Sequence, residues 1–319
     1  MPRMTASINK PGGTRARVLF RGLLFPALLF LAAPALGGQP VCDLSKARDV
    51  ELEHKLLQLA NEQGLSRAAA SGKLALSLLV LSNPDKPRLA QINGDEMIYA
   101  ASLPKIAILL GAAVAMDEGR LKPDVALQQD VQRMIRYSCN DCANRVLRRV
   151  GYQNVLETLQ RPEYAFYDLH RNGGLWVGKE YGPSPAYHRD PLHGLSHGAT
   201  VYEVSRFYCA LQRDELVSHE QDQMMLEALS RPGIKHKFVK ALSSIKGLEI
   251  FRKSGTWKDY HADSALVRDG DKAYVMVALA HDPKGSSWLE RLAQPLRRLA
   301  ESTGNTTGKT TRTASAAGR

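Results

Sequence analysis

The stretch Ser102-Leu103-Pro104-Lys105 stands directly ahead of the apolar run from Ile106 to Leu110. A serine three residues before a lysine, where an apolar helix opens, places the hydroxyl and the amine on one face about a turn apart. A serine hydroxyl attacks a carbonyl when a neighbour accepts its proton, and a buried lysine with a lowered pKa can do this. The same tetrapeptide is also typical of a helix N-cap followed by a solvated lysine. Its chemistry therefore depends on partner residues elsewhere in the chain.

The first 37 residues have the order of a secretory signal peptide: basic, then apolar, then small. Five basic residues and no acidic ones come before or within the apolar run, which covers residues 23–36 and is short for a membrane span. An uncleaved N-terminal anchor is the alternative. We expect a signal peptide at 1–37 and a periplasmic or secreted protein, without stable membrane insertion after cleavage.

The formal net charge of the 319-residue chain is +11, and much of it is peripheral. It falls to +6 without residues 1–37, and to +3 when residues 302–319 are also left out. We expect no nucleic-acid partner, since so small an excess gives little reason for one, and we expect a monomer. Residues 302–319 lack apolar periodicity and are predicted to be a disordered basic tail.

The chain contains four cysteines, Cys42, Cys139, Cys142 and Cys209. An even number in an exported protein favours disulfides, and four cysteines allow three pairings, among which the sequence does not choose. Cys139 and Cys142 form a Cys-x-x-Cys pattern, but the βαβ context of a thioredoxin-type redox motif is absent. We expect at least one disulfide, which ties Cys42 or Cys209 to this region.

Hydrophobic periodicity predicts a sheet whose strands come from both ends of the chain, with helices between them. The helical pattern covers residues 45–63, 102–118, 125–135, 141–150, 154–159, 201–212, 220–229 and 288–300, and the strand pattern covers residues 74–81, 88–92, 249–257, 262–267 and 273–280. Residues 173–198 read as a long irregular loop, which is usually functional. We predict an α/β (α+β) sandwich in one domain, 38–301. An α/β lobe (45–98 and 236–301) holds an antiparallel sheet with flanking helices, and an inserted helical lobe (102–235) leaves a cleft at Ser102.

Two further segments carry residues that a serine/lysine acylating site would need. Ser138-Cys139-Asn140 precedes a helix, where a hydroxyl can relay a proton and a carboxamide can hold a substrate amide. Lys253-Ser254-Gly255-Thr256 lies in a strand, where glycine allows close approach of a ligand backbone and lysine adds positive charge. The alternatives are helix capping for the first segment and an exposed edge-strand lysine for the second.

Taken in this order, the three motifs resemble those of class A β-lactamases and penicillin-binding proteins, and the similarity extends over residues 45–300. The resemblance implies a β-lactamase/transpeptidase-like fold and an exported serine hydrolase that opens β-lactam amide bonds through an acyl-enzyme at Ser102, with no cofactor. One alternative is a D,D-carboxypeptidase or transpeptidase of the penicillin-binding-protein kind, which acts on peptidoglycan stem peptides. A second alternative is a catalytically silent envelope-binding module.

The resemblance also assigns roles to individual residues. Ser102 is expected to be the nucleophile and Lys105 its proton acceptor. Ser138 is expected to pass a proton to the leaving nitrogen, and Asn140 to bind the substrate's side-chain amide. On the strand, the resemblance assigns the substrate carboxylate to Lys253 with Ser254 or Thr256, beside Gly255, and the oxyanion hole to the backbone N–H groups of Ser102 and Thr256.

The sequence departs from the class A pattern in three places. Cys139 stands where class A enzymes usually have aspartate, and the segment between Ser102 and Ser138 is shorter. No Glu-x-x-Leu-Asn signature for deacylation lies between residues 140 and 200. By position, Glu180 is the candidate general base, with Asp168 and Asp190 as weaker candidates. If none of them serves, deacylation is expected to be slow.

Three histidines in the same loop, His188, His193 and His197, raise the possibility of a zinc site. Neutral imidazoles in a confined loop can bind zinc. Their spacing, however, is not a standard zinc signature, and a site also needs tetrahedral geometry. We therefore predict no metal, and keep zinc on this loop as the alternative.

Overall fold

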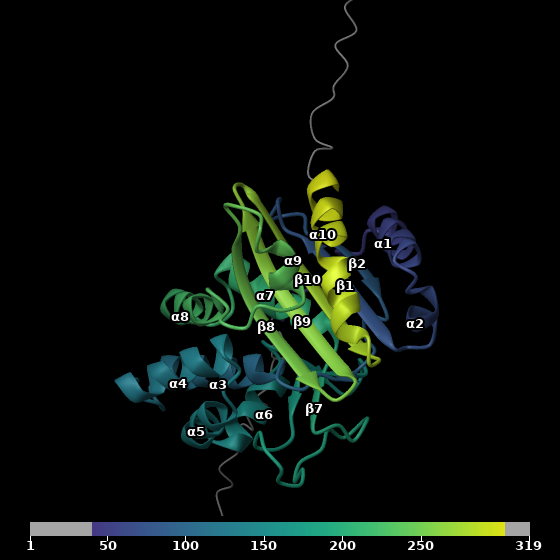
Figure 1. Cartoon of the computed structure of the whole chain (residues 1–319). Helices are drawn as coiled ribbons and strands as arrows, with labels where there is room; N and C mark the ends of the chain where they lie inside the picture. The colour runs from purple at the N-terminus through teal and green to yellow at the C-terminus, as the bar shows by residue number, and fades with distance from the viewer. Residues whose placement is uncertain (1–39, 304–319) are drawn as a thin grey trace, which may run out of the picture. The chain divides into compact units, whose positions relative to one another are not determined.

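The computed structural model describes residues 40–303, so the predicted signal peptide and nearly all of the predicted tail lie outside the described residues. At the centre is a five-stranded antiparallel sheet with the order β2-β1-β10-β9-β8 (Figure 1). Its strands are β1 (Leu74–Val80), β2 (Arg88–Ile92), β8 (Glu249–Trp257), β9 (Tyr260–Asp269) and β10 (Lys272–His281). The sheet thus takes its strands from both ends of the chain, as predicted.

Successive residues of β1 pack on opposite faces of the sheet. Leu74, Leu76 and Leu78 join the apolar core that contains α1 (Val50–Glu62), α9 (Phe238–Leu242) and α10 (Gly285–Thr303). Ala75 and Leu79 join the larger core that contains α3 (Lys105–Asp117) and α7 (Val201–Arg213). All seven residues of β1 are buried, which is why the strand shows no alternation in sequence.

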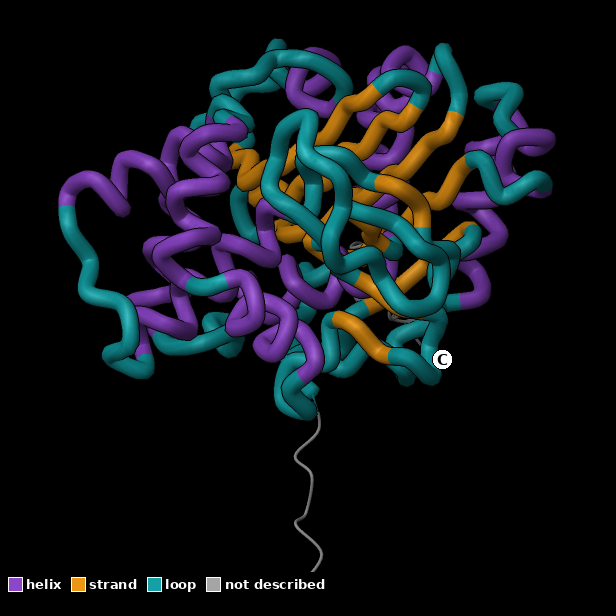
Figure 2. Tube along the Cα trace, turned by 90° about the horizontal axis from the view of Figure 1, so that it is seen from below, coloured by secondary structure: helices purple, strands orange, loops and turns teal. Residues whose placement is uncertain are grey.

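The segment between the sheet's two halves is mainly helical, and α3 is its central helix. Every residue from Lys105 to Ala115 is buried, since α3 is apolar all round and contacts the helices about it. These are α4 (Val125–Arg136), α5 (Asn140–Val150), α6 (Tyr152–Gln160) and α8 (His219–Leu229). In Figure 2 these helices gather to one side of the strands. Within residues 40–303 no helix is long and apolar enough to cross a bilayer.

Local chemistry moves several predicted boundaries. The first helix begins at Val50 rather than Ser45, because the Asp49 side chain caps it by accepting from the Leu52 N–H. The last helix continues to Thr303, so residues 302 and 303 are helical rather than part of a disordered tail. The short helices α2 (Ser66–Ala70) and α9 were not predicted. A helix of five residues is too short to show a clear 3.6-residue period.

The loop predicted to be irregular contains short strands that fix its position. They are β5 (Gly173–Gly174), β6 (Trp176–Val177) and β7 (His197–Ala199), and β4 (Tyr167–Asp168) pairs with β5. β7 lies between β6 and β3 (Ile98–Tyr99) in a three-stranded sheet, with Tyr99 opposite Gly198. The loop is therefore hydrogen-bonded to the strand that leads into Ser102.

The expected disulfide bonding is present in the structure, but neither bond has the pairing that we expected. Cys42 is bonded to Cys209, which connects the segment before α1 to α7, and Cys139 is bonded to Cys142. The expectation of a bridge from Cys42 or Cys209 to the Cys-x-x-Cys region is therefore wrong. Cys42 and Cys209 are buried in the same core with Cα atoms 6.0 Å apart. The pairing therefore follows from tertiary packing, which brings these two cysteines together.

Candidate active site

Ser102 lies in the turn between β3 and α3, which begins at Ala101 with a φ of 51°. β8 packs against this turn at Gly255, where a Cβ would overlap the Ala100 carbonyl oxygen and lie 2.8 Å from the Ser102 backbone nitrogen. The interpretation of Gly255 as a place for a ligand backbone is therefore corrected. The backbone that approaches Gly255 is that of the Ser102 turn, and only glycine allows this contact.

Ser102 is partly exposed and lines a cavity of about 630 Å³ between β3, β8 and the loop before β7. Asn140 and Thr256, two other predicted site residues, line the same cavity. Within residues 40–303, neither the hydroxyl nor the backbone N–H of Ser102 makes a hydrogen bond. Both groups thus remain available to a substrate carbonyl.

Lys105 is fully buried beside this cavity, and its amine contacts the two ends of the Ser138–Asn140 motif. Nζ donates to the Ser138 carbonyl oxygen at 2.6 Å and to Asn140 Oδ1 at 2.8 Å. It also lies 4.4 Å from the ring centroid of Tyr181. Burial lowers the pKa of Lys105 to about 7, so a large share of the amine is neutral near neutral pH. No hydrogen bond joins Nζ to Ser102, so sequence spacing alone does not bring the two groups together.

Ser138 lies between two lysines. Its hydroxyl accepts from Lys253 Nζ at 3.0 Å and, at a longer 3.4 Å, from Lys105 Nζ. Ser138 has a φ of 57°, which turns the chain so that its carbonyl and hydroxyl both face Lys105. The fold thus brings the Ser138 hydroxyl close to both lysine amines.

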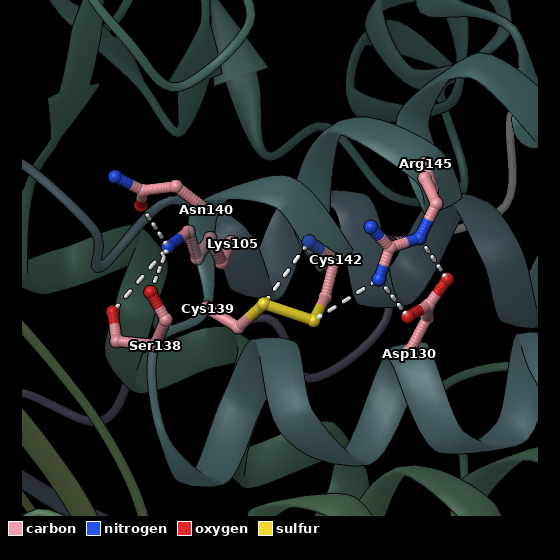
Figure 3. Close-up of a disulfide and its surroundings, with 7 residues drawn as sticks. All are labelled: Lys105, Asp130, Ser138, Cys139, Asn140, Cys142 and Arg145. Atoms are coloured by element: carbon pink, nitrogen blue, oxygen red, sulfur yellow. Dashed lines mark hydrogen bonds and ion pairs between the residues drawn. A yellow bond between two sulfur atoms is a disulfide. The ribbon is translucent and has the colours of Figure 1, made fainter.

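The Cys139–Cys142 disulfide closes a ring over the start of α5, which contains Asn140 and directly follows Ser138 (Figure 3). Cys139 is the N-cap residue of α5, and its sulfur accepts from the Cys142 N–H at 3.1 Å. Arg145 approaches the Cys142 sulfur at 3.5 Å. A covalent ring therefore occupies the place where class A enzymes usually have an aspartate, and it constrains the backbone between two site residues.

On β8, Lys253 is buried and its amine bonds to Ser138 Oγ and to the Ser254 carbonyl oxygen. Burial, reinforced by the neighbouring cations Lys105 and Arg252, holds the pKa of Lys253 well below its ordinary value. Ser254 is also buried and is not among the residues that line the cavity, whereas Thr256 lines it. Of the two predicted hydroxyl partners for a carboxylate, Thr256 is the accessible one.

Lys237 is a site residue that the sequence analysis missed. Its fully buried amine donates to Thr256 Oγ1 at 2.8 Å, to the Gly255 carbonyl at 2.7 Å and to the Ala262 carbonyl at 3.0 Å. Burial lowers its pKa to about 8. Nothing in the local sequence distinguishes Lys237 from the neighbouring Lys235. Only the tertiary fold brings the Lys237 amine into contact with Gly255 and Thr256 of β8.

A buried ion pair fixes the segment that carries Lys237. Arg252 donates to both carboxylate oxygens of Asp263, at 2.6 and 2.9 Å, and to the Ile234 carbonyl at 2.9 Å. Asp263 also accepts from the Phe238 backbone N–H at 3.1 Å. These bonds attach the residues on either side of Lys237 to β8 and β9.

Of the adjacent loop residues Glu180 and Tyr181, Tyr181 lines the cavity and lies beside the Lys105 amine. Asn144 of α5 determines this position, because its side chain accepts from the Tyr181 N–H at 2.7 Å and donates to the Tyr181 carbonyl at 2.9 Å. Neither residue was predicted from the sequence to belong to the site. The place of Asn144 one helical turn after Asn140 was the available signal.

The prediction of Glu180 as a general base is not supported by the structure. Its carboxylate forms two 2.6 Å hydrogen bonds with the Arg148 guanidinium and does not line the cavity. The hydrogen bonds from Arg148 lower the pKa of Glu180, which weakens it further as a base. Asp190 accepts from backbone N–H groups of its own loop, at Leu192 and His193 among others, and Asp168 accepts from the His170 N–H. Neither lines the cavity.

The three loop histidines have separate surroundings. His188 stacks on Tyr152, His193 lies 3.3 Å from the Asn172 carbonyl, and His197 stacks on Tyr181. Burial lowers the pKa of His197 to about 3, so its imidazole is neutral at physiological pH. In the part of the chain that the structure describes, no three His, Cys, Asp or Glu side chains converge as metal ligands would.

Comparison with known proteins agrees with this geometry. The sequence matches the profile described as "Beta-lactamase enzyme family" over residues 123–301, more than half of the chain. Similar solved structures include a β-lactamase from Sphaerobacter thermophilus (TM-score 0.62, 16% identity, covering 78% of this chain and 97% of that one). A structure of PBP-A is also similar (0.58, 18%, 79% and 97%), as is the chromosome-encoded β-lactamase of Vibrio parahaemolyticus (0.59, 15%, 80% and 100%). No curated protein matches the sequence.

The fold is therefore that of the β-lactamase and penicillin-binding protein superfamily, the class of serine β-lactamase-like hydrolases and penicillin-binding-protein-like proteins. Within that class, the chain belongs to the beta-lactamase enzyme family. The predicted superfamily and fold class are confirmed.

Proposed function

We propose that this protein is an exported serine acyl-transfer enzyme that forms an acyl-enzyme at Ser102 with β-lactams and with peptidoglycan stem peptides. The observation that carries the proposal is the buried network in which Ser138 Oγ lies within reach of both Lys105 and Lys253, beside the cavity that Ser102 lines. Export is supported by the N-terminal pattern and by two disulfides, which persist in oxidising compartments.

In the proposed reaction, Ser102 Oγ attacks the carbonyl carbon of the scissile amide while neutral Lys105 accepts the hydroxyl proton. Substrate binding must first bring Oγ within hydrogen-bond distance of Nζ, because catalytic contacts often tighten only in the complex. The oxyanion is stabilised by the backbone N–H groups of Ser102 and Thr256. The C–N bond then breaks, Ser138 gives its proton to the leaving nitrogen, and Lys105 returns a proton to Ser138.

The substrate carboxylate is proposed to bind beside Thr256, with Lys253 and Lys237 supplying positive charge. Their amines approach the Ser138 and Thr256 hydroxyls at 3.0 and 2.8 Å. An arriving carboxylate favours the charged form of each lysine, which burial alone disfavours. Asn140, which lines the cavity, is placed to bind the amide of the substrate's acyl side chain.

The geometry favours slow release of the acyl group. The loop residue beside Lys105 is Tyr181, and the candidate base Glu180 is paired with Arg148 outside the cavity. A tyrosine whose pKa is raised by burial is a poor base at neutral pH. We therefore favour a penicillin-binding-protein-like activity over efficient β-lactam hydrolysis, which remains the second candidate function because the family profile is that of β-lactamases.

Intact-protein mass spectrometry after exposure to benzylpenicillin and to a carbapenem tests the proposal. The expected result is a mass increase of one intact lactam that persists for hours, and no adduct on the Ser102→Ala variant. Free enzyme with opened lactam would instead establish β-lactamase activity. Neither adduct nor turnover with either compound would refute both candidate functions for these substrates.

A further inference from the structure

The loop side of the Ser102 cavity carries two cations, Lys179 and Arg189. Within residues 40–303 neither forms an ion pair, whereas nearby Arg148 is paired with Glu180. No aspartate or glutamate is among the residues that line this cavity. A hollow lined by cations and lacking carboxylates has a positive potential that attracts an anion.

Both cations keep hydrogen-bond donors that the protein does not use. Lys179 Nζ donates to the carbonyl oxygens of Gly182 and Ser184, which leaves one of its three N–H donors. Arg189 donates one N–H to the Gly194 carbonyl at 2.8 Å, which leaves four of its five donors. These carbonyl contacts hold the cations in place, while the unused donors remain for a ligand.

An aromatic group lines the same cavity from the β8 side. Trp257 is 49% exposed, and the Tyr99 ring lies 5.4 Å from it and 5.1 Å from the Tyr260 ring between centroids. Lys258 Nζ lies 4.6 Å from the Trp257 ring centroid and the Tyr260 ring stacks on His281, so one face of each of these two rings is covered. The remaining aromatic surface can contact apolar and ring-shaped groups. The cavity thus combines an apolar wall with an anion-attracting wall.

The loop cations and the aromatic rings lie apart from the position proposed for the carboxylate on the substrate's leaving group. That carboxylate belongs beside Lys253 and Lys237, which bond to Ser138 and Thr256 and are not among the cavity's lining residues. When a substrate binds at Ser102 with its carboxylate beside Lys253 and Lys237, its acyl part extends into the Ser102 cavity toward the loop. The loop cations can therefore recognise a second negative charge in the same substrate.

We propose that Lys179 and Arg189 form an anion subsite that selects acyl donors with a carboxylate on the acyl side of the scissile bond. The substrate class is then an amide or lactam with an acidic and partly apolar acyl group, such as a peptide with an acidic residue on the amino side of the cleaved bond. This inference rests on the proposed acylation at Ser102 and adds to it a specificity for charge.

Benzylpenicillin and carbenicillin provide a matched pair of probes, since carbenicillin differs only by a carboxylate on its acyl side chain. The second-order acylation rate constant is measured for each at low ionic strength by intact mass. For each protein we take the ratio of the carbenicillin rate constant to the benzylpenicillin rate constant. We expect this ratio to be about fivefold higher in the wild type than in Arg189→Gln. A partly exposed ion pair contributes up to ~1 kcal/mol, which is equivalent to about that factor. Raising the salt concentration should reduce the preference.

Four variants separate the subsite from general charge effects. Arg189→Gln and Lys179→Gln should lower the carbenicillin-to-benzylpenicillin ratio, and Arg189→Lys should retain most of it. Arg67→Gln, at an exposed position of α2, removes the same charge outside the cavity and should leave the ratio unchanged. Because Arg189 is exposed, its replacement tests the subsite even if Lys179→Gln disturbs the loop.

An equal ratio in the wild type and in Arg189→Gln, with both lactams forming adducts, would overturn the subsite while leaving the proposed acylation intact. A lowered ratio in Arg67→Gln equal to that in Arg189→Gln would also overturn it, since net charge would then explain the preference. Absence of any adduct from either lactam would refute the acylation itself, and the subsite with it.

Discussion

Replacing Lys105 with methionine should remove a pH dependence of folding stability that burial of this amine creates. The pKa of Lys105 is about 7 in the folded protein, against 10.5 for a free lysine. Between these values the unfolded chain holds one proton more than the folded protein, so the free energy of unfolding rises with pH. Well below pH 7 both states hold the proton, and the group adds no slope.

The size of this effect depends on the two pKa values. One pKa unit corresponds to about 1.4 kcal/mol, and the folded amine is half titrated at the lower end of the range. Between pH 7 and pH 9, Lys105 should therefore add about 2 kcal/mol to the free energy of unfolding of the wild type. The Lys105→Met variant should lack this increase, because methionine fills the buried site without a titrating group.

Urea unfolding at pH 7 and pH 9, with the disulfides oxidised, measures the difference. Both pH values lie below the range in which tyrosines of the unfolded chain ionise. Lys86→Met, in the turn between β1 and β2, is the control, because its exposed amine is solvated in both states. A wild-type-minus-variant difference that stays constant from pH 7 to pH 9 would show that the Lys105 amine is not held with a lowered pKa.

Two further changes test how the site is positioned. The double variant Cys139→Ser with Cys142→Ser should acylate about tenfold more slowly, because small displacements of reacting groups cost one to two orders of magnitude in rate. Dithiothreitol should slow the wild type to the same rate and leave the variant unaffected, whereas equal rates throughout would show that the disulfide does not position the site. Tyr181→Glu should speed release of the acyl group about tenfold to a hundredfold by supplying a general base, measured as decay of the adduct mass. Glu180→Gln should leave this decay unchanged, and a slower decay in that variant would restore Glu180 as the base.

Most of the sheet and the helices could be predicted because their patterns are local. The strand Glu249–Trp257 has the predicted bounds, and the apolar run after Lys105 forms the central helix α3. The resemblance of three short motifs to a known family was enough to name Ser102, Lys105, Ser138 and Lys253 before their contacts were known. The strands of two or three residues and the five-residue helices α2 and α9 escaped prediction, since neither the helical nor the strand period is clear over so short a length.

The sequence could not show which loop residue lies beside Lys105. Glu180 and Tyr181 are adjacent, and chemical type alone favoured the glutamate. Asn144 holds the backbone of Tyr181 through two hydrogen bonds, so the tyrosine faces Lys105 while Arg148 pairs with its neighbour. The disulfide pairing was open for the same reason, because it depends on which cysteines the folded core brings together.

By itself, the sequence determined the order of the longer elements and indicated a candidate nucleophile with its neighbours, because these depend on residue type and short spacing. Only the tertiary structure decided that Lys237 joins Thr256, that Gly255 packs on the Ser102 turn, and that a tyrosine occupies the loop position beside Lys105. Each of these contacts joins residues far apart in the chain. Their energies come from burial and hydrogen bonds that exist only once the sheet and the helical segment have packed together.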